Sequence, residues 1–198
     1  NFGTLSQMKR DMMAEVAATL AFSTIANNDK VGVIFFSDKV EKFIPAQKGK
    51  THVLHIIREL LSFEPSSSGT NMAQALQYFA NAQKRHCTAF LISDFIGTGA
   101  IYKPLMIASN RHEVNAIQIY DRREAELPNL GLVKFHDAET GDDLWIDTAI
   151  STVRNDYARA WRDNQNEIQQ LFTKTGVNNI SIRTDEDYVK ALMHLFRC

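Results

Sequence analysis

Apolar and polar positions along the chain follow two spacings, one typical of helices and one typical of buried strands. Over residues 5–26 the apolar positions recur every three or four residues, which predicts a helix. The uninterrupted apolar run 31–37 is typical of a strand covered on both faces. The same patterns predict further helices over 51–61, 71–82, 102–109, 151–175 and 186–196, and further strands over 40–44, 87–93, 114–120 and 179–183.

Strands that alternate with helices of this length predict an α/β fold with a mostly parallel sheet. The alternation is interrupted near residues 130–147, where two short segments flank a turn-like stretch. This pattern predicts a β-hairpin inserted between the repeating units. A chain of 198 residues without a low-complexity tract is expected to form a single domain over 1–198.

The composition restricts the partners and the location. The 22 basic and 23 acidic residues give a net charge of −1. The sequence has no long basic block of the kind that binds nucleic acid, so nucleic acid is not expected as a partner. No apolar stretch is long enough to cross a bilayer, so we expect no membrane segment within this chain. Two cysteines are too few for a disulfide framework and favour a cytoplasmic location, with any targeting or membrane segment left to residues upstream.

Thr70 and Asp94 are the candidate metal ligands. Thr70 lies just before a predicted helix, and Asp94 directly follows a buried strand. In an open α/β sheet, ligands bind at the edge formed by the carboxyl ends of the strands. A hydroxyl and a carboxylate at that edge suit a hard cation such as Mg²⁺. The competing interpretation is structural: Thr70 caps the helix, and Asp94 closes the loop after the strand.

Other polar residues are candidates for supporting roles. Asp121 also follows a predicted strand, where it either belongs to a solvated turn or supports the metal ligands. Ser68 and Asn71 flank Thr70 and are candidates for the same support. His52 and His55 share a helix, but without a third ligand they are expected to be exposed helix residues. The chain has no nucleotide-binding glycine loop and no nucleophile elbow, so binding is favoured over catalysis.

A series of short segments carries a more specific pattern. In chain order they are Asn1-Phe2-Gly3-Thr4, Asp29-Lys30-Val31-Gly32-Val33-Ile34-Phe35-Phe36, Ser68-Gly69-Thr70-Asn71, Leu91-Ile92-Ser93-Asp94-Phe95, Asp121-Arg122-Arg123-Glu124-Ala125-Glu126-Leu127-Pro128, Asp137-Ala138-Glu139-Thr140-Gly141 and Ile146-Asp147-Thr148. Together they resemble the bacterial "domain of unknown function fifty-eight" family of von Willebrand factor A-like domains. Members of that family are commonly encoded beside MoxR-type AAA+ ATPases.

The resemblance implies a doubly wound, Rossmann-like sheet and a metal ion-dependent adhesion site that holds Mg²⁺, Mn²⁺ or Ca²⁺. Thr70 and Asp94 match two of the family's ligand positions. The family's Asp-x-Ser-x-Ser motif has no match here, because in relatives it stands immediately before the segment equivalent to residues 2–4. The resemblance therefore implies that this chain lacks the first, central strand. We expect weak or no metal binding by this chain, and a sheet with a gap, a remodelled centre or a strand lent by another copy.

The expected function is protein interaction without catalysis. The resemblance implies that the metal ion presents an open coordination position to a partner's carboxylate. It also implies an adaptor for a MoxR-type ATPase or its client in protein maturation or assembly. Two alternatives stay open: a metal-dependent hydrolase that uses Asp94, and a scaffold whose metal site is degenerate.

Overall fold

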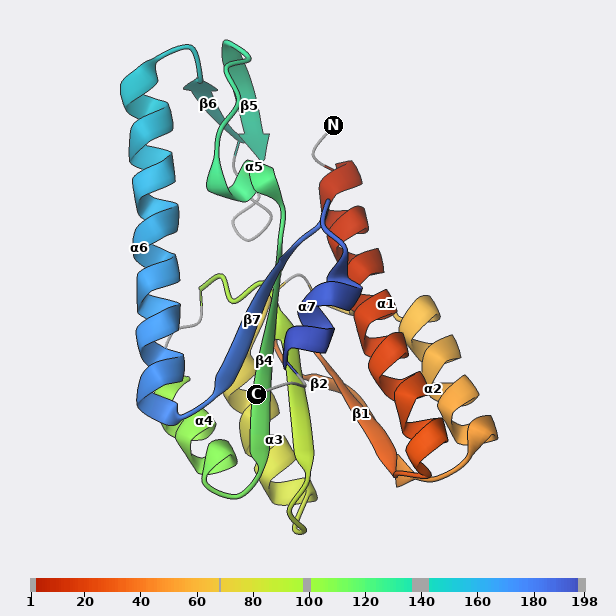
Figure 1. Ribbon diagram of the computed structural model, residues 1–198. Coiled ribbons are helices and arrows are strands. Elements are labelled where there is room, and N and C mark those ends of the chain that lie inside the picture. The colour runs from red at the N-terminus through yellow and green to blue at the C-terminus, as the bar shows by residue number, and fades with distance from the viewer. Residues whose placement is uncertain (1–2, 68, 98–100, 137–142, 196–198) are drawn as a thin grey trace.

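The computed structural model describes residues 3–67, 69–97, 101–136 and 143–195. Helices and strands alternate along most of the chain (Figure 1), as the hydrophobic pattern predicts. The elements in chain order are α1 (Gly3–Asn27), β1 (Val31–Phe36), β2 (Val40–Gln47), α2 (Lys50–Ser62), α3 (Met72–Ala82), β3 (Thr88–Ser93), α4 (Tyr102–Ser109), β4 (Glu113–Tyr120), α5 (Arg122–Ala125), β5 (Leu132–His136), β6 (Asp143–Asp147), α6 (Ser151–Thr175), β7 (Asn178–Arg183) and α7 (Tyr188–Leu195).

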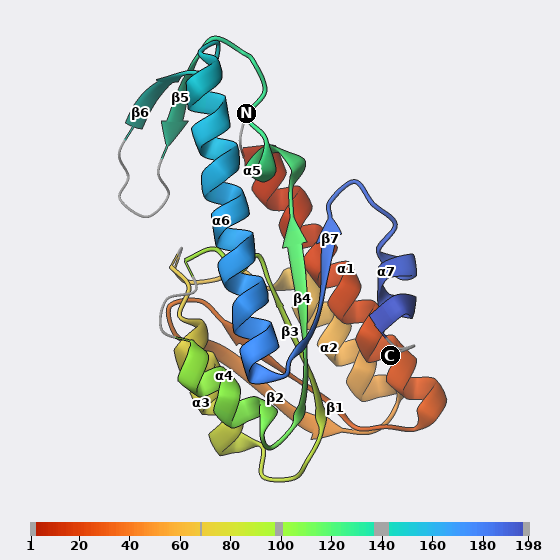
Figure 2. The same ribbon diagram turned by 60° about the vertical axis from the view of Figure 1, so that its left-hand side comes forward.

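The core of the molecule is a three-stranded parallel sheet in the order β3-β4-β7. Successive side chains of the central strand point to opposite faces of this sheet. Ala116 packs in a cluster with residues of α3, α4 and α6, whereas Ile117 packs in a cluster with residues of α1 and α7. Helices therefore cover both faces of the sheet, as Figure 2 shows. The prediction of a mixed α/β fold with parallel strands is confirmed.

Strands β1 and β2 form a separate antiparallel pair. The sequence pattern ends β2 before Pro45, and this boundary is wrong because the strand continues to Gln47. The register shifts between Val31 and Val33, so that the β2 side carries an extra residue at this point. Such a bulge accommodates a proline, which has no amide hydrogen to donate to the ladder.

The two sheets are not joined by backbone pairing in the part of the chain that the structure describes. Helix α1 nevertheless packs on both of them: Leu20 belongs to the cluster of β4 and β7, and Ala21 to the cluster of β1, β2 and α2. On the other side, the backbone N–H of Asn71, just before α3, donates to the Ser37 carbonyl at 2.6 Å. The strand layer is therefore interrupted between β1 and β3, as the family resemblance leads us to expect.

Strands β5 and β6 pair antiparallel, which confirms the predicted hairpin. Its turn, residues 137–142, lies outside the described residues. Thr148 closes the base of the hairpin: its buried hydroxyl accepts from the Leu130 N–H at 2.9 Å and donates to the Gly131 carbonyl at 2.8 Å. The hairpin lies at the N-terminal end of α6, away from α4 (Figure 1).

Candidate functional site

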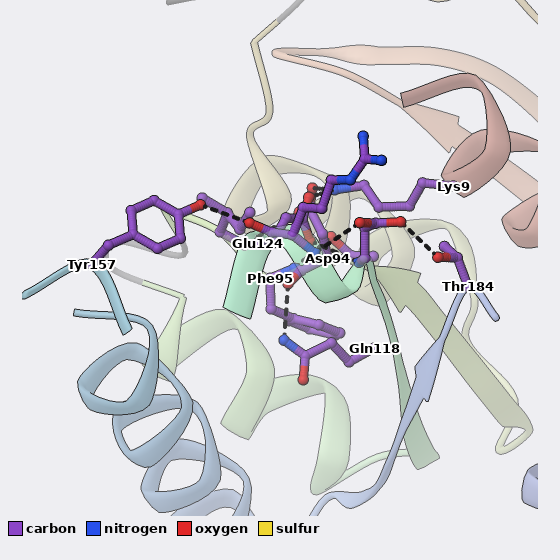
Figure 3. A network of polar contacts seen from close by, with 11 residues as sticks. Lys9, Asp94, Phe95, Gln118, Glu124, Tyr157 and Thr184 are labelled. Atoms are coloured by element: carbon purple, nitrogen blue, oxygen red, sulfur yellow. Dashed lines mark hydrogen bonds and ion pairs between the residues drawn. The ribbon is translucent and has the colours of Figure 1, made fainter. Parts of the chain in front are cut away.

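The carboxyl ends of β3, β4 and β7 meet at one edge of the parallel sheet, which we call the strand-end edge. It comprises Asp94, Asp121 and Thr184 after the strands, together with Lys9 of α1 and Glu124 of α5 (Figure 3). The side-chain amide of Gln118 donates to the Asp94 carbonyl at 3.0 Å and so fixes the backbone after β3 from the neighbouring strand.

The Asp94 carboxylate is engaged through both oxygens. Its Oδ1 accepts from the Ile96 N–H at 3.2 Å, as the competing structural interpretation of Asp94 predicts. Its Oδ2 lies 2.8 Å from the Lys9 ammonium. The next residue, Phe95, has a φ of 56°, an uncommon backbone conformation for a residue other than glycine. Its fully buried ring packs edge-on against Phe172, which holds this turn in place.

The Lys9 ammonium contacts a second carboxylate, with Nζ 2.6 Å from Glu124 Oε1. The Lys9 side chain is 14% exposed, against 30% for Asp94 and 26% for Glu124. Burial works to lower the pKa of Lys9, but the charge of Asp94 and the hydrogen bonds to both carboxylates outweigh it, and the pKa is raised. Lys9 is therefore a fixed positive charge shared between two acids.

Asp121 is buried and supports the short helix α5. Its Oδ1 accepts from the Arg123 N–H, and its own N–H donates to Glu124 Oε2, a reciprocal capping box. Its Oδ2 accepts from the Thr184 hydroxyl at 2.8 Å. The interpretation of Asp121 as a solvated turn residue is therefore wrong. Asp121 is linked to Asp94 through Glu124 and Lys9, and its support of a metal ligand stays a prediction.

Thr70 lies in the loop beside the end of β1. The N-cap of α3 is Asn71, whose Oδ1 accepts from the Gln74 N–H at 3.0 Å, so the capping interpretation of Thr70 is wrong. The Thr70 side chain is exposed and forms no hydrogen bond to another described residue, Asp94 included. Ser68 lies outside the described residues. The assignment of Thr70 as a ligand stays a prediction.

These residues do not by themselves fit a divalent metal ion. Thr70 and Asp94 offer oxygen donors of the right chemistry, but Mg²⁺ requires about six ligands and Lys9 already holds one Asp94 oxygen. Across the described residues, no group of three or more histidine, cysteine, aspartate or glutamate side chains is arranged to hold a metal. His52 contacts the Val31 carbonyl at 2.9 Å through Nε2, and His55 is exposed on the same helix.

Sequence reasoning missed Lys9, Gln118 and the role of Glu124. The signal for Lys9 was present in the helical spacing. Lys9 precedes Met12, Val16 and Leu20 at intervals of three or four residues, and these three side chains pack in the core cluster beneath α1. A lysine that extends a buried stripe toward the end of a helix indicates a partner carboxylate nearby.

Comparison with known proteins identifies a family and several relatives of this chain. The family described as "Protein of unknown function DUF58" matches residues 1–167. "Uncharacterized protein Rv1480" of Mycobacterium tuberculosis is 30% identical over 193 residues, which cover 96% of this chain and 60% of that protein. "Uncharacterized protein MAV169" of Mycobacterium avium is 28% identical over 158 residues, covering 78% of this chain and 92% of that protein. This chain therefore spans 60% of the length of the first of these relatives.

Two solved structures share the fold. The conserved hypothetical protein BatB from Bacteroides thetaiotaomicron superposes with a TM-score of 0.54 at 15% identity, over 93% of this chain and 86% of that one. An aerotolerance-related membrane protein from Bacteroides fragilis superposes with a TM-score of 0.59 at 17% identity, with the same coverage. None of the described helices of this chain combines the length and the apolar composition required to span a membrane.

Proposed function

The chain belongs to the DUF58 family of proteins of unknown function, and we propose that it is a non-catalytic protein-interaction domain with a von Willebrand factor A-like fold. The observation that carries the proposal is the convergence of Asp94, Asp121 and Thr184 at the strand-end edge, where α/β sheets bind their ligands. Helices on both faces of the parallel sheet support the doubly wound architecture that such a domain requires.

The contact surface in this proposal is the strand-end edge together with the loop that carries Thr70. Gln118 and the capping box of α5 hold the backbone around Asp94 and Asp121 in one conformation. A preorganised edge of this kind binds a partner without the cost of ordering loops. This rigidity favours recognition.

In this proposal, a divalent cation (Mg²⁺, Mn²⁺ or Ca²⁺) is coordinated jointly by this domain and its partner. Thr70 and Asp94 would supply part of its oxygen donors, and the remainder would come from outside the described residues. When bound, the ion would offer an open position to a carboxylate of the partner.

The partner we propose is a MoxR-type AAA+ ATPase or its client, in a cytoplasmic process of protein maturation or assembly. This part of the proposal is supported by the family resemblance of the sequence motifs. The proposed metal ion adds a requirement on the partner, which would present a carboxylate to the open coordination position of the ion.

A binding assay tests the proposal. The full-length protein is titrated with the MoxR-type ATPase of the same genome in Mg²⁺, using wild type, Asp94→Ala and Asp29→Ala. Asp29 is an exposed carboxylate that precedes β1, away from the strand-end edge, and serves as the control. We expect Asp94→Ala to weaken binding at least about tenfold and Asp29→Ala to leave it unchanged. Equal binding by all three proteins would remove Asp94 from the contact surface.

The contact between Lys9 and Asp94 favours a second candidate, a scaffold with a degenerate metal site that acts through surface contacts. Removal of divalent ions with a chelator discriminates the metal-dependent interaction domain from the scaffold. Loss of partner binding supports the metal-dependent domain, and unchanged binding that still requires the strand-end edge supports the scaffold.

A further inference from the structure

We propose that the outward side of helices α1 and α2 is an interface at which two copies of this chain form a symmetric dimer. This surface, which we call the helix-pair face, comprises Phe22 of α1 with Leu54, Ile57 and Leu61 of α2. Phe22 lies on the C-terminal half of α1, whereas Lys9 near the other end of this helix belongs to the strand-end edge. The inference therefore goes beyond the proposed function and does not depend on it.

The apolar side of α2 is wider than the surface that the rest of the chain covers. Val53 and Ile56 are buried in the cluster that includes residues of β1 and β2. Leu54 and Leu61 continue the apolar side around the helix, with Ile57 between them, and are 46% and 65% exposed. A surface helix normally turns only one apolar stripe inward and presents polar residues to water. The exposed leucines therefore indicate a second surface that α2 buries against another molecule.

Helix α1 contributes to the same surface through Phe22, which is 56% exposed. A shallow groove runs between the two helices and is lined by Ala18, Thr19, Phe22 and Ile57. Figure 1 shows α1 and α2 side by side at the outer edge of the molecule, with no described element beyond α2. The groove is therefore open to a partner.

The two walls of the groove carry opposite charges. Glu15 is exposed on α1 one turn before the groove, and Arg58 is exposed on α2 directly after Ile57. Among the described residues, neither side chain forms an ion pair. The two helices are antiparallel, because His52 near the start of α2 contacts the Val31 carbonyl just after the end of α1. Glu15 and Arg58 therefore lie within about one turn of each other along the groove.

This charge pattern favours a second copy of the chain as the occupant. In a twofold dimer the same patch meets itself, so the patch has to be self-complementary. If the twofold axis runs along the groove, α1 of each copy lies against α2 of the other at the same height. Glu15 of each copy then faces Arg58 of the other, and Phe22 faces Leu54. One arrangement therefore pairs both charges and covers the exposed apolar side chains.

The dimensions of the helix-pair face predict a weak, reversible dimer. Helix α2 has 13 residues and is about 20 Å long. Two adjacent helices, each about 10 Å wide, offer a face of about 400 Å² per copy. Interfaces at this small end of the size range form weak, transient complexes. We therefore expect a Kd of about 10–100 μM.

The first test is sedimentation velocity of the full-length protein at about 1–300 μM, a range that brackets the expected Kd. Wild type is compared with Phe22→Asp and with Leu130→Asp, a control that changes a similarly exposed apolar residue outside the helix-pair face. We expect Phe22→Asp to weaken dimerisation at least about tenfold and Leu130→Asp to leave it unchanged. Thermal unfolding checks that each variant is folded. A wild type that stays monomeric, or a Phe22→Asp variant that dimerises like the wild type, would overturn the inference.

A charge exchange tests the identity of the occupant. Glu15→Arg alone places like charges opposite each other at both contacts of the dimer, and so does Arg58→Glu alone. Each variant should therefore dimerise at least about tenfold more weakly than the wild type. In an equimolar mixture, a dimer of one Glu15→Arg copy and one Arg58→Glu copy regains an attractive pair at both contacts. We expect this mixture to dimerise with the wild-type affinity.

The mixture distinguishes a second copy from a helix of a different protein as the occupant of the groove. If the wild type dimerises but the mixture stays monomeric, Glu15 and Arg58 do not face each other and the inference is wrong. Wild-type affinity of either charge variant alone would overturn it as well.

Discussion

At the residue scale, the role of a polar side chain depends on whether its atoms already have partners. Asn71 and Thr70 are neighbours in one loop, yet the side chain of Asn71 accepts a helix N–H and that of Thr70 is exposed without a hydrogen bond to another described residue. The same principle distinguishes the two acids at the strand ends. Asp121 accepts from a backbone N–H and a hydroxyl, whereas Asp94 accepts from a backbone N–H and contacts the ammonium of a lysine.

Substitution separates the capping role from the ligand role in this loop. Asn71→Ala should lower the free energy of unfolding by about 1 kcal/mol, because it removes the N-cap of α3. Thr70→Ala should change the free energy of unfolding by less than about 0.5 kcal/mol, since the side chain is exposed. Urea denaturation measures both. If Thr70→Ala is the more destabilising variant, the assignment of the cap to Asn71 is wrong.

A second prediction concerns His112, which is 3% exposed at the opposite end of β4 from the strand-end edge. Its Nδ1 lies 3.6 Å from Cys87 Sγ, and its Nε2 has no hydrogen-bond partner in the described part of the chain. Burial lowers the pKa of His112 below its usual 6.5, and the positive charges of His86 and Arg111 lower it further. The folded state therefore binds this proton less readily than the unfolded state.

It follows that the contribution of His112 to stability is lost as the pH falls below 6.5, where the unfolded chain takes up the proton first. Between about pH 7.5 and about pH 5.5 the wild type should lose up to about 1 kcal/mol of unfolding free energy more than His112→Phe, an aromatic variant that cannot titrate. Urea denaturation at the two pH values measures this difference. Parallel pH dependence of the two proteins would count against a buried, neutral His112.

At the element scale, the pair β1-β2 depends on close backbone contact. A side chain at Gly32 would place its Cβ 2.7 Å from the Ile44 carbonyl oxygen and 2.8 Å from the Ala46 nitrogen, both backbone atoms of β2. These atoms belong to the bulged part of the ladder that accommodates Pro45. Glycine at this position therefore allows the two strands to pair despite the proline.

Gly32→Ala should destabilise the protein by about 1–3 kcal/mol, because the β2 backbone has to move away from the added methyl group. Gly69→Ala is the matched control, since its Cβ would meet Asp38 Cβ at 3.4 Å, an ordinary contact. Thermal unfolding of the two variants tests the prediction. Equal melting temperatures of Gly32→Ala and Gly69→Ala would show that the β2 backbone moves away from the added methyl group without a loss of stability.

At the scale of the whole molecule, the interruption between β1 and β3 divides the strand layer into parts that helices hold together. The link is made by side chains, with Leu20 and Ala21 of α1 packing into different clusters. Among the described residues, β1 and β3 each have one edge without a backbone partner beside this break. Side-chain packing across the break is expected to resist opening less than a continuous backbone ladder would. The two parts are therefore expected to open with different free energies.

Native-state hydrogen exchange tests this expectation. Amides of β1, β2 and α2 should exchange through a partial opening, at a lower free energy than the amides of β4, whose strand is paired on both sides. Peptide-level mass spectrometry at increasing denaturant distinguishes the two parts. A single opening free energy for β1 and β4 at every denaturant concentration would mean that the molecule unfolds as one cooperative unit despite the break.

The sequence by itself determined most of the elements, α5 excepted, and placed Asp94 and Asp121 directly after their strands. It could do so because helix and strand periodicities are local properties of neighbouring residues. The bounds of α4 and α6 agree with the predicted ranges, and the hairpin strands fall where the pattern places them. The boundary at Pro45 was wrong because a bulge in β2, which forms only when β2 pairs with β1, permits the proline.

The tertiary structure decided which of these residues meet. Lys9 lies 85 residues before Asp94 and 115 before Glu124, so no local pattern encodes their contact. It arises because α1 packs across the ends of strands that come much later in the chain. The break between β1 and β3 was expected from a family resemblance, yet the packing of α1 and α3 across it is a property of the folded molecule. Local spacing therefore determined the position of each polar side chain within its helix, strand or loop. Long-range packing determined which other side chain it contacts.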